Sequence, residues 1–283
     1  MSEALSNQRF APTKTSKLPN ILNLVRRELH EIWKYRWVVY SYVYTTTKIR
    51  YKRSYLGYFW TVLGPMTHYI MIGFVMGLLL KARMDNYYVH YFTGALFFSI
   101  VAGILNKAPA IMLGNEHFIR KIYVPKAIFL LNVVSYELVN FAFSATGLLI
   151  LGLASGFLHL SWAFSVSILG LVLTGLFLLG VAACLSILTV YFRDFGHITP
   201  VLVQALFFLT PIAYNTAMLP PEYQWLPKMN PIYYFLEIVR RPLIDGQIPE
   251  PYFFGVASAL TLTSLIIGAT VLRIFDNKII FKL

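Results

Sequence analysis

Long stretches without charge, separated by short polar segments, dominate the hydropathy pattern of this 283-residue chain. A helix needs about 20 mostly apolar residues to cross the hydrocarbon core of a bilayer. The pattern therefore predicts an all-α integral membrane protein with six transmembrane helices, at residues 56–80, 91–112, 128–153, 162–190, 198–214 and 252–274. Asn106 and Lys107 interrupt the second stretch, and the fifth is short, with Pro200 and Pro211 near its ends.

The segment before the first predicted span has the pattern of an amphipathic helix. Within residues 21–55, apolar residues recur at helical spacing with basic residues between them, and these apolar positions are Leu22, Val25, Leu29, Ile32, Trp33 and Trp37. The pattern is typical of a helix in the membrane interface, with its Trp side chains at headgroup depth. A soluble helix packed on a cytoplasmic partner is the alternative. The chain thus divides into a cytoplasmic segment, residues 1–55, and a transmembrane domain, residues 56–283.

A proline-rich segment separates the last two predicted spans. Proline interrupts continuous helix, so residues 215–251 are expected to form several short helices. The apolar and aromatic run at residues 233–239 is expected to dip into the outer membrane surface as a re-entrant or gate-like element. Irregular backbone at that depth requires surrounding protein or a water-filled cavity.

Composition and charge agree with a membrane protein. Only 13% of the residues are charged, compared with about 25% in a typical soluble domain. Most of the 24 Lys and Arg residues fall before the first predicted span, between the second and third, and after the sixth. Because Lys and Arg collect in cytoplasmic loops, both ends of the chain are expected in the cytoplasm. Residues 1–20 lack the apolar run of a cleavable signal peptide, so insertion is expected to begin at the first span.

Sequence motifs for catalysis are missing. The sequence contains neither the G-x-x-x-x-G-K-[ST] phosphate loop nor a zinc-binding pattern, so the chain is not expected to hydrolyse ATP or to bind a metal. A membrane enzyme acting on polyprenyl phosphate would need an acidic pair or another metal site. The sequence therefore favours a transport protein over an enzyme.

Two charged residues interrupt the predicted spans. Glu137 lies well inside the third span, where exposure of a carboxylate to lipid is costly. It serves either a proton relay, as in an ion-coupled secondary transporter, or a structural role in which it is protonated or hydrogen-bonded to a polar neighbour on another helix. A second acidic residue at membrane depth is not expected. Lys107 is expected to snorkel to the cytoplasmic surface rather than to face the bundle interior.

Four stretches together resemble the permease subunits of ABC-type exporters of O-antigen, capsule and teichoic-acid polysaccharides. They are residues 50–60 with Gly64 and Pro65, 115–126, 191–195 and 230–246. The resemblance implies export of a lipid-linked polysaccharide from the cytoplasmic to the outer side of a bacterial inner membrane. It also implies a homodimer with two separate ATPase subunits, which bind ATP and Mg²⁺ while this chain binds no cofactor. An ABC permease for a small lipid or a drug is a further alternative.

The resemblance and the charge pattern select three groups of candidate residues. Contact with the ATPase is expected from Asn115, Glu116, Phe118, Ile119, Arg120 and Lys121, unless this loop is only a solvated basic loop. Arg50, Lys52 and Arg53 are expected either to recruit the phosphate of the substrate or only to fix the orientation of the chain in the membrane. Sugar C–H groups pack on aromatic rings, so a channel lining or gate is expected from Phe59, Trp60, Phe97, Phe207, Tyr233 and Tyr234. Ordinary packing suits each of these rings as well.

Overall fold

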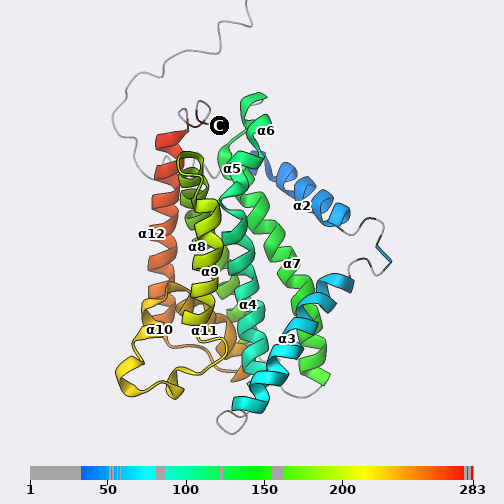
Figure 1. The fold of residues 1–283 in the computed structure, drawn as a ribbon, viewed down its shortest axis with the longest axis vertical. Coiled ribbons are helices and arrows are strands. Elements are labelled where there is room, and N and C mark those ends of the chain that lie inside the picture. Colours follow the sequence, from blue (N-terminus) through cyan, green and yellow to red (C-terminus); the bar gives the residue numbers. More distant parts are fainter. Residues whose placement is uncertain are drawn as a thin grey trace, which may run out of the picture.

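The chain folds into a bundle of long helices with shorter helices at both ends (Figure 1). The computed structural model describes residues 33–50, 52, 54–55, 57, 59–80, 87–121, 124–154, 162–276, 279 and 282, and these form no strand. The helices are α2 (Arg36–Arg50), α3 (Phe59–Leu80), α4 (Tyr87–Lys107), α5 (Ala110–Gly114), α6 (Glu116–Lys121), α7 (Lys126–Ala154), α8 (Phe164–Tyr191), α9 (Phe195–Leu209), α10 (Leu226–Met229), α11 (Pro231–Ile244) and α12 (Pro251–Phe275). Helices α2 and α6 and the end of α12 lie at one end of the bundle, and α10 and α11 lie at the other.

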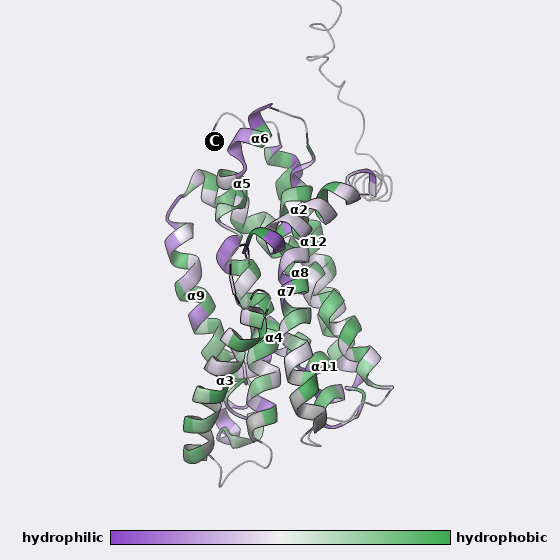
Figure 2. Cartoon of the chain, turned by 90° about the vertical axis from the view of Figure 1, so that its right-hand side faces the viewer, coloured by the Kyte–Doolittle hydropathy of each residue, from purple (hydrophilic) through white to green (hydrophobic). Residues whose placement is uncertain are grey.

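Four of the described helices are long and apolar enough to cross a membrane. These stretches are Val89–Lys107 in α4, Lys126–Gly147 in α7, and the whole of α8 and α12. Figure 2 shows hydrophobic residues along the bundle and hydrophilic residues around α6. Helix α3 has 22 residues without a charge and stays a predicted span. The 15 residues of α9 make about 22 Å of helix, less than the roughly 30 Å of a hydrocarbon core, so six spans also remain a prediction.

The second predicted span ends earlier than the hydropathy suggested. Helix α4 ends at Lys107, and a turn at residues 108–109 separates it from α5. Pro109 has no N–H to donate, and its ring disfavours helical backbone in the residue before it. The prediction that this span continues to residue 112 is therefore wrong.

The fifth predicted span also ends early, for a related reason. Helix α9 ends at Leu209, and Thr210 has extended backbone with φ −84° and ψ 131°. Thr210 precedes Pro211, and a residue before proline avoids helical backbone. Residues 210–214 consequently form bends, so the prediction of helix up to residue 214 is wrong.

Helices α8 and α12 pack closely along most of their length. A Cβ atom at Gly180 would overlap the carbonyl of Ser264, and one at Gly268 would lie 2.8 Å from the Gly180 oxygen. Glycine at both positions therefore lets the two backbones touch, as small residues do in membrane helix pairs. Ser264 Oγ donates a hydrogen bond to the Phe177 carbonyl across the same contact at 3.1 Å. This pair forms a rigid wall of the bundle.

The prediction of short helices between the last two spans is confirmed. Two 3₁₀ turns, Thr216–Met218 and Pro221–Tyr223, precede α10 and α11. Helix α11 buries most of its residues and packs against α4, α8 and α12. Asn230 starts this helix because its side chain accepts a hydrogen bond from the N–H of Ile232 at 3.0 Å. Its amide group also donates to Thr210 Oγ1 at 2.8 Å, which ties α11 to the end of α9.

Within residues 21–55 the structure describes one helix, α2 (Arg36–Arg50), which overlaps the predicted amphipathic stripe only at its end. Helix α2 packs across α7, and Trp33 and Trp37 are exposed. The Arg36 guanidinium lies 4.7 Å from the Trp33 ring centroid and 5.7 Å from that of Trp37. Residues 21–32 and Arg53 lie outside the described residues, and the interfacial position of α2 stays a prediction.

Candidate functional site

The predicted ATPase-contacting loop forms two short helices that project from the bundle. Helix α5 is anchored by Ile111 and Met112, which are buried, whereas none of the six residues of α6 is buried. Asn115 joins the two helices, and its side-chain amide donates to the Ile111 carbonyl at 2.7 Å. Helix α6 is therefore an exposed element on a firmly packed base.

The side chains of α6 point to different surroundings. Phe118 is 57% exposed, while Ile119 packs partly against the core. Arg120 Nε donates to Glu116 at 2.8 Å along the helix, and Lys121 is exposed. Phe118 is thus the large apolar side chain of α6 available to a partner, and its contact with an ATPase remains a prediction.

The basic residues proposed for substrate recruitment lie in different surroundings. Arg50, the last residue of α2, donates from Nη1 to the hydroxyl of Tyr136 on α7 at 3.0 Å. Lys52 is exposed. The structure therefore brings Arg50 against the helix bundle, where it joins the charged residues described next.

Lys107 and Glu137 form an ion pair between α4 and α7. Glu137 is 8% exposed, while the Lys107 side chain is 47% exposed. Lys107 Nζ also lies 4.5 Å from the Tyr136 ring centroid, a distance at which a cation is attracted to the ring. The prediction that Glu137 bonds a polar neighbour on another helix is confirmed. Lys107 pairs with this carboxylate while its side chain stays half exposed, so snorkelling to the cytoplasmic surface remains a prediction.

The predicted lining aromatics do not form one surface within the chain. Phe97 is fully buried, and Tyr233 and Tyr234 are buried as well. Phe207 packs edge-on against Phe98, with ring centroids 5.3 Å apart. Phe59 and Trp60 are exposed. Packing therefore accounts for most of these rings in a single chain, and a lining role remains a prediction.

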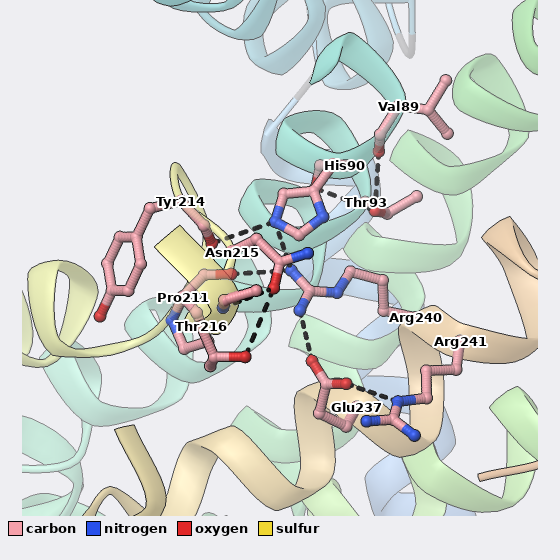
Figure 3. A network of polar contacts seen from close by, with 11 residues as sticks. Val89, His90, Thr93, Pro211, Tyr214, Asn215, Thr216, Glu237, Arg240 and Arg241 are labelled. Atoms are coloured by element: carbon pink, nitrogen blue, oxygen red, sulfur yellow. Dashed lines mark hydrogen bonds and ion pairs between the residues drawn. The ribbon is translucent and has the colours of Figure 1, made fainter. Parts of the chain in front are cut away.

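A buried ionic network lies at the end of the bundle opposite α6 (Figure 3). Glu237 of α11 bridges Arg240 and Arg241: one carboxylate oxygen pairs with Arg240, and the other accepts from Arg241 Nε at 2.7 Å. Glu237 and Arg240 are 6% and 7% exposed. Burial alone would raise the pKa of Glu237, but the two guanidinium groups hold that pKa below its usual value.

The network joins α11 to two other segments. Arg240 Nη1 donates to the Pro211 carbonyl at 2.7 Å and lies 3.0 Å from His90 Nε2 on α4. The same His90 nitrogen lies 3.2 Å from the Tyr214 carbonyl, so the tautomer decides which group it bonds. Arg240 is therefore the point where α4, α11 and the segment after α9 meet (Figure 3).

The sequence interpretation missed this network. It counted Arg240 and Arg241 only as outer-side charges and gave Glu237 no role. A detectable signal was the spacing of Glu237, Arg240 and Arg241, since residues three and four apart share one helix face. His90 carried no such signal, because its partner is 150 residues away.

Comparison with known proteins identifies the family. Residues 39–244 match the family described as the ABC-2 type transporter, which is more than half of the chain. The chain belongs to the ABC-2 type transporter family. The ABC-2 match extends from within α2 to the end of α11, so it includes both ionic clusters and the projecting α5 and α6.

Curated relatives of this ABC-2 transporter have related names. It is 26% identical over 236 residues to "O-antigen export system permease protein RfbA" of Klebsiella pneumoniae, covering 83% of this chain and 89% of the relative. It is 24% identical over 256 residues to the protein of the same name from Myxococcus xanthus, covering 89% and 96%. It is 22% identical over 233 residues to "Polysialic acid transport protein KpsM" of Escherichia coli, covering 80% and 88%. The similarity thus spans most of both chains in each case.

Proposed function

We propose that this chain is the membrane permease of an ATP-driven exporter for lipid-linked polysaccharide of the O-antigen type. The observation that carries the proposal is the likeness to export permeases from three organisms, which covers most of each relative. Two of these are named for O-antigen and one for polysialic acid. The polymer moves from the cytoplasmic to the outer side of a bacterial inner membrane, and this chain supplies the path.

ATP hydrolysis takes place on a separate subunit. Two copies of this chain pair with two ATPase subunits, which bind ATP and Mg²⁺. The exposed helix α6 supports this arrangement. Its Phe118 side chain is exposed among charged residues and is therefore available to a partner. The residues that contact the ATPase are Asn115, Glu116, Phe118, Ile119, Arg120 and Lys121.

Six spans and two cytoplasmic chain ends make up the membrane arrangement. The position of α6 and the end of α12 at the same end of the bundle supports it, as does the excess of Lys and Arg before the first predicted span, between the second and third, and after the sixth. Helix α11 enters the outer surface as a re-entrant element near the exit. Lys52 and Arg53, beside Arg50, recruit the phosphate of the lipid carrier at the cytoplasmic entrance.

An ion-coupled secondary transporter is less well supported. Such a mechanism would use Glu137 as a proton carrier, but this carboxylate is already paired with Lys107. An ABC permease for a small lipid or drug is also less well supported, since the relatives described above are named for polysaccharides.

The proposal is tested by purifying the chain from its native membrane in mild detergent. A co-purifying ATPase subunit with vanadate-sensitive activity, together with glycan trapped inside a deletion strain, is the expected result. A chain that purifies alone and transports under an ion gradient would contradict it.

A double substitution sharpens the role of α6. Phe118→Asp with Ile119→Asp places two charges on the side chains expected to enter the ATPase, so co-purification of the ATPase should fall at least about ten-fold. Gln224→Asp, at an exposed position just before α10, is a matched control and should leave assembly intact. Full assembly and export by the double variant would remove α6 from the interface.

A further inference from the structure

The Lys107–Glu137 pair lies where the segment formed by α5 and α6 joins the bundle. Lys107 is the last residue of α4, and α5 and α6 follow it directly. Glu137 lies eleven residues into α7, about three helical turns from the start of that helix. The pair therefore connects α4, which precedes α5 and α6 in the chain, with α7, which follows them, at the level where α4 ends.

The same position on α7 also holds α2. Tyr136 is next to Glu137 in the chain, and its hydroxyl accepts the hydrogen bond from Arg50 at the end of α2. Lys107 lies over the ring of this tyrosine. Three helices, α2, α4 and α7, thus meet through four neighbouring side chains, which we call the cytoplasmic latch: Arg50, Lys107, Tyr136 and Glu137.

The backbone of α4 is shaped to receive the carboxylate. A Cβ atom at Gly103 would lie 2.6 Å from Glu137 Oε2, so glycine leaves the space that this oxygen occupies. Asn140 Nδ2, one turn further along α7, lies 3.5 Å from the same oxygen. Glu137 is therefore seated against α4 by shape as well as by charge.

We propose that the cytoplasmic latch passes the ATP-driven displacement of α6 to α2, and so opens the cytoplasmic entrance. Lys107 and Glu137 are positioning residues in this step, and the proposal rests on the proposed function. Apolar contacts between helices allow sliding, whereas an ion pair with a hydrogen-bonded neighbour holds a defined relative position. With the latch closed, α4, α7 and α2 move together when α6 is pulled.

Charge exchange tests the latch in the complex of this chain with its co-purifying ATPase. Glu137→Gln and Lys107→Gln should each lower polysaccharide exported per ATP hydrolysed by about ten-fold, within the usual range of coupling between sites. ATP hydrolysis itself should persist, because α6 still contacts the ATPase. The double variant Lys107→Glu with Glu137→Lys should recover export per ATP to within about three-fold of the native value.

Controls separate this result from general damage. Glu222→Gln removes an exposed carboxylate from the 3₁₀ turn Pro221–Tyr223 and should leave export per ATP unchanged. Tyr136→Phe removes only the acceptor for Arg50 and should give a smaller loss, about three-fold. Equal export per ATP in Glu137→Gln, Lys107→Gln and native complexes would overturn the inference, as would an exchanged pair that folds but shows no recovery.

A second measurement follows α2 without relying on export. The chain has one cysteine, Cys184, so Thr45→Cys in a Cys184→Ala background gives one reactive thiol on the exposed side of α2. Labelling by a water-soluble maleimide should change in rate when ATP and vanadate are added to the complex, and Glu137→Gln should abolish that change. An unchanged rate in the native complex, or an equal change in both, would overturn the inference. A native complex without ATPase activity would instead contradict the proposed function.

Discussion

The two ends of the bundle hold their charged residues in different ways. At the α6 end, Glu137 is buried but its partner Lys107 is nearly half exposed. At the α11 end, Glu237 and Arg240 are both buried, and Arg240 also binds the carbonyl of Pro211. The Lys107 amine of the first cluster can exchange its partner for water, whereas the Arg240 guanidinium of the second is buried and cannot.

Loss of the carboxylate has a different consequence at each end. If Glu137 is lost, the half-exposed Lys107 amine can turn to water. If Glu237 is lost, the Arg240 guanidinium remains a buried charge. We therefore regard the network at α11 as a fixed contact between α4, α11 and the segment after α9, and the cytoplasmic latch as a contact that can rearrange.

The largest expected effect is the difference in stability between variants of Glu237 and of Glu137. Glu237→Ala should lower the free energy of unfolding by about 3–5 kcal/mol, the usual consequence of leaving a buried charge unpaired. Glu137→Ala should lower it by about 1 kcal/mol, because Lys107 can turn to water. Thermal denaturation of the purified protein in detergent measures both, with Glu222→Ala as the exposed control. Equal losses for the two variants would remove the distinction between the clusters.

Gly103→Ala is expected to have an intermediate effect. The added Cβ meets the Glu137 carboxylate, which is the far end of a flexible side chain. Stability should therefore fall by only about 1 kcal/mol, while export per ATP falls several-fold because the pair is displaced. Gly196→Ala, at a position where a Cβ would meet no atom within 4 Å, is the control. Normal export by Gly103→Ala, with the carboxylate demonstrably moved, would show that the seat on α4 is unimportant.

Acidification should have the smallest effect. The pKa of Glu237 in the folded protein lies below its usual value, which is about 4.3 in an unfolded chain. A lowered pKa means that the stabilisation is complete above the unfolded value and is lost only as the pH falls through the folded value. The difference in melting temperature between native protein and Glu237→Gln should thus stay constant from about pH 7 to pH 5. A difference that shrinks within this range would indicate that Arg240 and Arg241 do not hold the carboxylate charged.

Particular elements show how far the sequence could be interpreted. The ends of α7, α8 and α12 lie within about two residues of the predicted spans, because long apolar runs leave few alternatives. The early ends of α4 and α9 had visible causes in Pro109 and Pro211, but hydropathy outweighed them in the prediction. Glu237 was missed because its burial depends on α11 packing against α4 and α8, which no local pattern reports.

The sequence by itself determined that this chain is an all-helical membrane protein, that short helices separate its last two predicted spans, and that its motifs belong to an exporter permease. These follow from hydropathy, proline positions and motif order, which are local properties. The tertiary structure decided which charges meet: Lys107 with Glu137 across 30 residues, and His90 with Arg240 across 150. Such pairs are selected by the cost of burying a charge alone, and that cost arises only once distant helices have packed together.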